Sequence, residues 1–305
     1  IALISVIMTF ANMIDMLTVN PCIKTAMKAS PHTFDSLLSD KLTTDMLPNF
    51  IYGSYTGLAV TVFGLVPTIT AMFGKSILPS LAESCAKNDK KAMQSGLTKM
   101  LIVTSIIAIP AGMGIAVLSE PILRFLFGGR ETEIQVCIMP MSILGIAVIF
   151  LAIATPCFAI LQTLGKPHKA IIIMSAGGII KLFLNIILIR QPIINISGAA
   201  ISTLVSEVFI CVLSVRSVCK MTDLKPKVSE IFVKPTYAAI TCSVTAILSH
   251  ETLTKIAHLQ INHRFVTLFS IGIGSTMYFF CLYLLCETPK NIVNYIFSKK
   301  NPQNP

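Results

Sequence analysis

The chain has few charged residues for its length. Asp, Glu, Lys and Arg make up 12% of its 305 residues, whereas soluble domains contain roughly 25%. Hydrophobic residues make up 54% of the chain. A soluble fold cannot bury that much apolar surface, so the composition excludes a soluble domain. It predicts an all-α fold, a polytopic bundle of helices that span a lipid bilayer.

Motifs of metal binding and catalysis are also missing. The nine Cys residues are scattered, mostly inside apolar runs, without a Cys-x-x-Cys pair or a His at zinc-ligand spacing. The sequence shows no phosphate-binding loop, catalytic-triad spacing or His-Glu-x-x-His motif. We therefore expect no metal, no cofactor and no enzymatic activity.

The basic residues do not form a nucleic-acid-binding face. The formal net charge is +10, but a basic balance indicates nucleic acid only where it gathers on a soluble surface. Here Lys and Arg are spread between apolar runs, as the charges that set membrane topology are. We expect no nucleic acid partner.

The first residues include neither an initiator Met nor a signal peptide. The chain begins with IALISVIMTF, which already reads as an apolar helix. We expect that the sequence is truncated at its N-terminus.

Apolar runs that are long enough to span a membrane recur along the chain. Twenty helical residues cover roughly 30 Å, the thickness of a bilayer core. Pro67 and Pro110 predict kinks, and the polar stretch 20–49 predicts a loop. The runs are residues 1–19, 54–78, 97–118, 136–164, 170–189, 198–219, 231–248 and 265–286.

The loops alternate in their content of Lys and Arg. Loops after the second, fourth, sixth and eighth runs carry more basic residues than the loops on the other side. The positive-inside rule places these loops, and the C-terminus, in the cytoplasm.

The fifth run, AIIIMSAGGIIKLFLNIILI, contains one full charge, Lys181. A charge near the bilayer centre costs at least about 2.5 kcal/mol, so it requires a partner or a wet cavity. Lys181 lies about 17 Å from the start of its run, and Glu207 about 14 Å from the start of the next, antiparallel run, so their depths nearly match. We expect the two to approach. There are three alternatives. The two residues form an ion pair that fixes the register of the helices, or a charge faces a substrate cavity, or each residue has a separate partner. Gly177 and Asn185 share the face of Lys181, which favours helix packing at Gly177 and an interhelical hydrogen bond from Asn185.

Polar residues also occur in the first two runs. Asn12 and Asp15 share one face of the first run. Asp15 is either a proton or cation site or a cap on a polar helix face. Lys75 lies near the cytoplasmic end of the second run, where it either snorkels to the surface or meets a phosphate.

Several segments together resemble a known superfamily. They are SYTGLAVTVFGLVPTIT, SILPSLAESCAKNDKKAMQSGL, IPAGMGIAVLSEPILRFLFGG, LAIATPCFAILQTLGKPHKAIIIMSAGGIIKLFLNIILI and ISGAAISTLVSE. In this order and spacing they resemble the multidrug/oligosaccharidyl-lipid/polysaccharide flippase superfamily. The branch they resemble most is that of the polysaccharide-biosynthesis transporters typified by stage V sporulation protein B. The second run has no Arg, unlike the lipid II flippase branch, and Lys75 is its one cation.

The resemblance implies a fourteen-helix fold with two six-helix lobes and two C-terminal helices. The eight runs match helices seven to fourteen, so the implied partner is a missing N-terminal lobe of the same protein. Residues 1–220 correspond to the second lobe, 221–289 to the two C-terminal helices and 290–305 to a cytoplasmic tail.

The implied function is the export of a lipid-linked saccharide for the cell wall, spore cortex or capsule across the bacterial plasma membrane by alternating access. The resemblance places Asn12, Asp15 and Lys75 toward the substrate cavity, and Lys181 and Glu207 in support of the lobe. The alternatives are a drug/cation antiporter of the same superfamily, with Asp15 as its coupling site, and a membrane scaffold that transports nothing.

Overall fold

The computed structural model describes residues 2–30, 43–87, 89–223, 229–257 and 263–285, and the described part is helical, without a strand. The side chains of residues 2–12, 73–76, 229–230, 256–257 and 263–264 lie outside the description, as does the tail expected at 290–305. Seven helical segments in the described part have the length and composition of membrane spans, which confirms the polytopic all-α prediction. They are Leu47–Met72, Lys90–Val117, Glu131–Thr163, Pro167–Leu188, Ser197–Thr222, Ile231–Lys255 and Phe265–Leu285.

The first helix is longer than the apolar run that predicted it. Helix α1 covers Ala2–Ala29 and contains Pro21, so the predicted loop from residue 20 is wrong over its first third. Val19, Cys22, Ile23 and Ala26 follow helical spacing and are at most 5% exposed. Burial of this one stripe stabilises the helix past Pro21, which removes a backbone donor.

The second run becomes a broken helix. It consists of α2 (Leu47–Ser54), a π-helical turn η2 (Tyr55–Val60), α3 (Thr61–Phe63) and α4 (Leu65–Ala86). The break at Gly64 lies three residues before Pro67, where the sequence predicts a kink. Because Pro67 lacks an N–H, the carbonyl of Phe63 has no helical donor.

The polar segment after the second run is shorter than predicted. Helix α4 continues to Ala86, and α5 covers Lys90–Val117. The carboxylate of Asp89 accepts a hydrogen bond from the backbone N of Ala92 at 3.0 Å. This N-cap satisfies one free N–H of the first turn and so starts α5 earlier than the apolar pattern indicates.

The remaining helices are α6 (Ser119–Phe127), α7 (Glu131–Thr163), α8 (Pro167–Leu188) and α9 (Ser197–Thr222), then η3 (Ser229–Val233), α10 (Lys234–Ala257) and α11 (His263–Leu285). Most of them correspond to predicted runs, whereas α6 matches none of these runs and α10 continues past the run 231–248. The turn between α7 and α8 contains Gly165 at φ +71°, a conformation that glycine adopts without strain. Pro167 is the first residue of α8, where its missing N–H costs no hydrogen bond.

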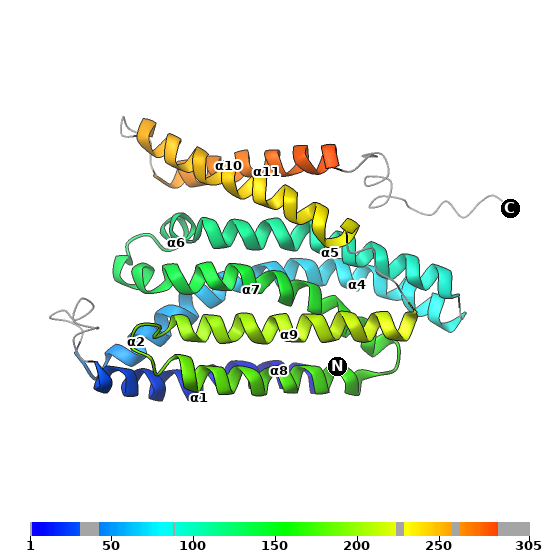
Figure 1. The fold of residues 1–305 in the computed structure, drawn as a ribbon, viewed down its shortest axis with the longest axis horizontal. Coiled ribbons are helices and arrows are strands. Elements are labelled where there is room, and N and C mark those ends of the chain that lie inside the picture. Colours follow the sequence, from blue (N-terminus) through cyan, green and yellow to red (C-terminus); the bar gives the residue numbers. More distant parts are fainter. Residues whose placement is uncertain (1, 31–42, 88, 224–228, 258–262, 286–305) are drawn as a thin grey trace.

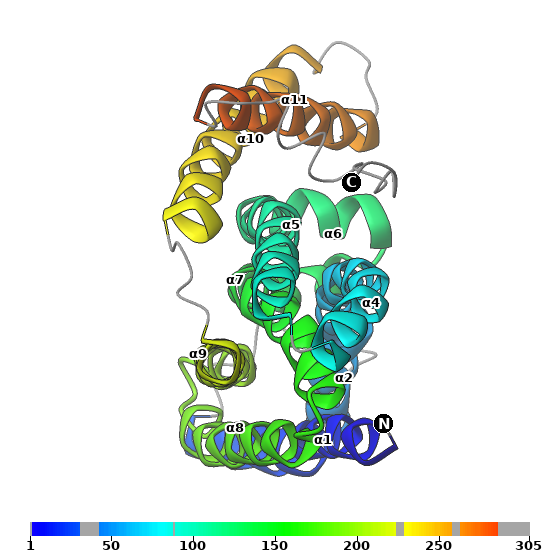
Figure 2. The same ribbon diagram turned by 90° about the vertical axis from the view of Figure 1, so that its right-hand side faces the viewer.

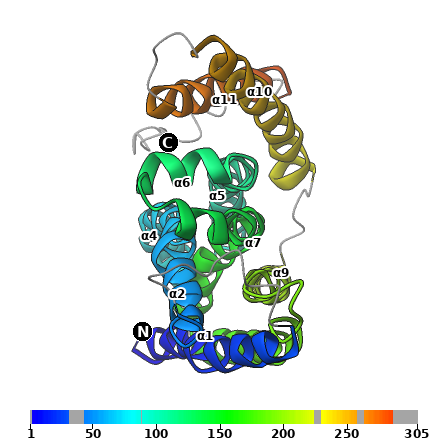
Figure 3. The ribbon, with the colours of Figure 1, turned by 90° about the vertical axis from the view of Figure 1, so that its left-hand side faces the viewer.

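The helices are stacked in layers (Figures 1 and 2). Helices α1 and α8 lie side by side at one edge, α7 and α9 come next, and α4, α5 and α6 follow. Helices α10 and α11 pair with each other at the opposite edge, as the view from the other side also shows (Figure 3). The hydroxyl of Tyr278 on α11 donates to the carbonyl of Ile106 on α5 at 2.9 Å, which attaches this pair to the bundle.

Helix α7 forms the centre of the bundle. It packs against α4, α5 and α9. A Cβ on Gly112 of α5 would lie 2.6 Å from the carbonyl oxygen of Gly145 on α7, so these helices approach backbone to backbone. Such close contact between small residues is typical of helix association in membranes, where dispersion replaces the hydrophobic effect.

Candidate functional site

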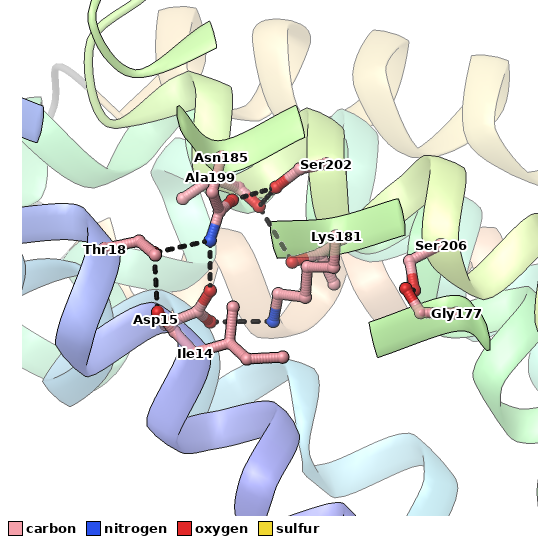
Figure 4. A network of polar contacts seen from close by, with 10 residues as sticks. Ile14, Asp15, Thr18, Gly177, Lys181, Asn185, Ala199, Ser202 and Ser206 are labelled. Carbon is pink, nitrogen blue, oxygen red and sulfur yellow. Dashed lines mark hydrogen bonds and ion pairs between the residues drawn. The ribbon is translucent and has the colours of Figure 1, made fainter. Parts of the chain in front are cut away.

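A buried polar network joins α1, α8 and α9 (Figure 4). The Nζ of Lys181 on α8 donates to Oδ2 of Asp15 on α1 at 2.8 Å. The side-chain amide of Asn185 donates to Oδ1 of Asp15 at 2.9 Å and to Oγ1 of Thr18 at 3.1 Å. Both carboxylate oxygens of Asp15 are therefore bonded from α8, and each is bonded by a different donor.

The third helix joins through one hydroxyl. Ser202 on α9 donates to the amide oxygen of Asn185 and shares its hydrogen with the carbonyl of Ala199. Thr18 donates in turn to the carbonyl of Ile14. Asn185 thus connects α1 with α9, using its amide hydrogens for one helix and its oxygen for the other.

The charged and amide side chains of the network are buried inside the bundle. Asp15 and Lys181 are each 8% exposed, and Asn185 is fully buried. An isolated charge at this depth is strongly unfavourable, and a partner of opposite charge with further hydrogen bonds offsets much of that penalty. The Asp15–Lys181 pair is neutral as a whole, which makes it compatible with a membrane interior.

Gly177 brings α9 close to the polar face of α8. A Cβ at this position would collide with the side chain of Ile210, and Ser206 donates to the carbonyl of Gly177 at 2.9 Å. The packing role predicted for Gly177 is confirmed. The face shared by Gly177, Lys181 and Asn185, read from the sequence, is the face that carries the network.

The structure corrects the predicted partner of Lys181, because its ion pair is with Asp15 and not with Glu207. Within the predicted run 1–19, Asp15 would lie only about 6 Å from the outer end, too shallow to match Lys181. Helix α1 instead continues to Ala29 and lies directly beside α8 (Figure 2). Glu207 is half-buried on α9, and its Oε2 is buried without a hydrogen-bond partner among the described residues. The carboxyl group of Glu207 thus lies near the network without taking part in its hydrogen bonds.

Two other predicted site residues are only partly placed. Asn12 lies in α1 and Lys75 in α4, and the side chains of both fall outside the described residues. A cavity-lining role for them stays a prediction. Asp15 differs from the expectation of an open cavity residue, since its carboxylate is taken up by Lys181 and Asn185.

Sequence reasoning missed Thr18 and Ser202 as members of the network. Thr18 follows Asp15 by three positions and thus shares its helix face. Ser202 lies in a run of small residues on α9 that includes Ala199 and Thr203. A hydroxyl in such a run predicts a hydrogen bond across a close helix contact, but its partner depends on which helices are neighbours.

Ionic contacts outside the spans connect helix ends. Arg124 on α6 donates to Glu120 at 2.9 Å and also to Glu131 at the start of α7. These hydrogen bonds raise the pKa of the Arg124 guanidinium above its usual range. At the other end of the bundle Lys90 pairs with Asp223 at 3.3 Å. Within the described residues no group of three or more His, Cys, Asp and Glu side chains is arranged to hold a metal ion.

Comparison with known proteins finds relatives, one of which is named as a lipid II flippase. The chain is 26% identical to the lipid II flippase MurJ of Bacillus subtilis over 136 residues, which are 45% of this chain and 25% of that protein. It is 22% identical to stage V sporulation protein B of the same organism over 182 residues, 59% of this chain and 34% of that protein. The chain thus spans between a quarter and about a third of the length of these relatives.

One solved structure supports the fold. A MOP superfamily transporter from Pyrococcus furiosus aligns with 92% of this chain and 67% of its own chain, with a TM-score of 0.51 and 14% sequence identity. At that identity the similarity concerns the arrangement of helices alone.

A family model covers most of the chain. The model described as lipid II flippase MurJ matches residues 50–273. The match runs from the broken helix formed by α2, η2, α3 and α4 to the middle of α11, and it includes the second run in spite of its lack of Arg. The chain is therefore a multi-pass membrane protein that belongs to the MurJ lipid II flippase family.

Proposed function

We propose that the chain is part of a flippase that moves a lipid-linked saccharide, such as a peptidoglycan or polysaccharide precursor, across a bacterial plasma membrane by alternating access. The observation that carries this proposal is the family match over residues 50–273. The names of the relatives, a lipid II flippase and a sporulation protein, agree with a cell-wall or spore-cortex substrate. The family relatives are transporters, so the proposed role is transport without catalysis.

The chain forms one lobe of that transporter. Residues 1–220 correspond to the six-helix lobe and residues 221–289 to the two further helices, of which α10 packs against α5. Because the relatives are much longer than the matched region, a first lobe supplies the opposite wall of the cavity. An isolated lobe lacks that wall, so the chain alone is inactive in transport.

The buried network has a mechanical role in this proposal. The Asp15–Lys181 pair and the amide of Asn185 fasten α1 to α8 and α9. In alternating access, one lobe rocks against the other around the substrate. A lobe that moves as one body requires its cavity-lining helix to be attached to the helices behind it. The network supplies this attachment between α1 and helices α8 and α9.

The cavity side of the lobe consists of α1 and the broken helix of the second run. Asn12 and Lys75 lie on these elements, and Lys75 provides a cation for the pyrophosphate of the substrate. The orientation with the C-terminus in the cytoplasm follows from the basic loops. It places Lys75 toward the cytoplasmic side, where the substrate enters.

Depletion of the full-length protein in its host tests the proposal. Lipid-linked saccharide should accumulate in the cytoplasmic leaflet, where an impermeant sugar-modifying enzyme added outside the cell does not reach it. Expression of the full-length gene should restore labelling, and expression of residues 1–305 alone should not. Unchanged labelling after depletion contradicts the proposed function.

A further inference from the structure

An apolar groove lies between α9, α10, α5 and α7, and none of the network residues lines it. It has a volume of about 600 Å³, and its walls are apolar almost throughout. Ile149 and Phe150 of α7, Val215 of α9 and Phe232 of η3 line it. The rim is open, because the lining residues Ile146 and Val212 are 45% and 57% exposed. We call it the α9–α10 groove.

One end of the α9–α10 groove is cationic. Arg216 is its one charged lining residue, and Lys220 follows one turn later on the same face of α9. Both side chains are exposed, and neither forms an ion pair with a described residue. The nearby Asp223 is already paired with Lys90. Two like charges at this spacing repel each other, so the pair is an attractive site for an anion.

The depth of these cations suits a lipid phosphate. Arg216 lies about 9 Å from the end of α9 at Thr222, and Lys220 about 3 Å from it. Long basic side chains at such positions keep their stems in the apolar layer and extend their charged heads toward the interface. The apolar groove then continues from the phosphate level into the hydrocarbon layer.

We propose that the α9–α10 groove binds an anionic phospholipid of the membrane, with its phosphate at Arg216 and Lys220 and one acyl chain along the apolar walls. Arginine binds phosphate in a planar, two-pronged geometry and is weakly hydrated, which favours the contact at a membrane surface. The choice of leaflet rests on the proposed orientation, which places this end of α9 in the cytoplasmic leaflet. That leaflet carries anionic lipids, and basic pockets between helices on this side bind their head groups.

The position of the groove separates this lipid from the proposed substrate. Helix α1 and the broken helix from α2 to α4, the expected cavity wall, contribute no residue to it. Helices α1 and α10 lie at opposite edges of the bundle (Figure 2). The occupant is thus a lipid that seals the seam between the six-helix lobe and the α10–α11 pair.

Native mass spectrometry of the purified chain tests the proposal without a transport assay. Phosphatidylglycerol and phosphatidylcholine with the same acyl chains are added in equal amounts. We expect the wild type to retain one phosphatidylglycerol in preference to phosphatidylcholine. Arg216→Gln should weaken phosphatidylglycerol binding about fivefold. Val212→Phe, which adds bulk at an exposed rim position, should weaken both lipids. Lys166→Gln, at an exposed lysine in the turn before α8, is the matched control and should bind as the wild type does.

Equal binding of the two lipids by the wild type overturns the proposal, and so does unchanged binding by a folded Arg216→Gln variant. Circular dichroism establishes that each variant is folded, and Lys220→Gln replaces Arg216→Gln if the latter does not fold. Displacement of phosphatidylglycerol by an equal amount of polyprenyl-linked saccharide also overturns it, because the groove then belongs to the substrate path.

Discussion

The ammonium group of Lys181 lies 2.8 Å from the carboxylate of Asp15, and 166 positions separate the two residues in the sequence. Each side chain is almost completely enclosed. The pair joins α1 to α8. The free energy with which α1 packs on the lobe therefore depends on the ammonium group of Lys181. The ammonium also takes the place next to Asp15 that a coupling cation of an antiporter requires.

Removal of one partner should destabilise the protein strongly. Lys181→Met leaves an uncompensated carboxylate in the membrane interior, and loss of one member of a buried pair costs about 3–5 kcal/mol. The double variant Asp15→Leu, Lys181→Met should recover most of this loss, since an apolar pair of similar size is nearly neutral. Unfolding of the purified protein in detergent, followed by circular dichroism, measures both.

The exposed pair of Lys87 and Glu83, 2.6 Å apart, is the control for that experiment. Lys87→Met should leave the unfolding transition unchanged, because solvent screens the pair. If Lys181→Met behaves like Lys87→Met, the buried pair has no structural role.

The hydroxyl of Ser202 should contribute measurably to stability. Ser202→Ala removes the donor to the amide oxygen of Asn185, and interhelical hydrogen bonds in membrane proteins contribute about 0.6 kcal/mol on average and up to about 1.7 kcal/mol. Thr245→Ala is a suitable comparison, since among the described residues Thr245 bonds only within its own helix. An equal effect of both substitutions argues against a link between α8 and α9 at this point.

Gly177 should not tolerate a side chain unless its neighbour shrinks. Gly177→Ala forces its methyl group against Ile210, and such overpacking costs about 1–3 kcal/mol. Ile210→Ala in the same chain should relieve the collision. Gly178→Ala is the control, because its added Cβ meets only the tip of Ile14, at 3.6 Å. The prediction is contradicted when both alanine variants unfold alike, or when Ile210→Ala gives no rescue.

Glu207 should be replaceable without loss of stability. Its Oε2 is buried without a hydrogen bond among the described residues, so Glu207→Leu removes a polar group that contributes little and costs desolvation. We expect an unfolding midpoint equal to or above that of the wild type. A clear drop in the midpoint indicates that Lys181 spends part of its time with Glu207.

The apolar runs predicted most helices because their composition leaves little choice of environment. The turn before α8 follows from the backbone preferences of Gly165 and Pro167 themselves. The extension of α1 past Pro21 was not predictable in this way, since only one stripe of residues 20–29 is apolar and its burial depends on neighbours. The prediction of Glu207 as the partner of Lys181 failed for a related reason. The depth of Lys181 was estimated correctly, but α1 and α9 both lie beside α8, and which carboxylate reaches Lys181 depends on the assembled bundle.

Transport by the full-length protein in proteoliposomes is the direct test of the assignment as a lipid-linked saccharide flippase. A fluorescent polyprenyl-linked saccharide and a cationic drug are supplied in parallel, and translocation is read as protection from, or access to, an impermeant quencher. We expect translocation of the lipid-linked saccharide and none of the drug, and we expect residues 1–305 alone to be inactive toward both. Ion-driven translocation of the drug without movement of the saccharide would contradict the assignment as a lipid-linked saccharide flippase.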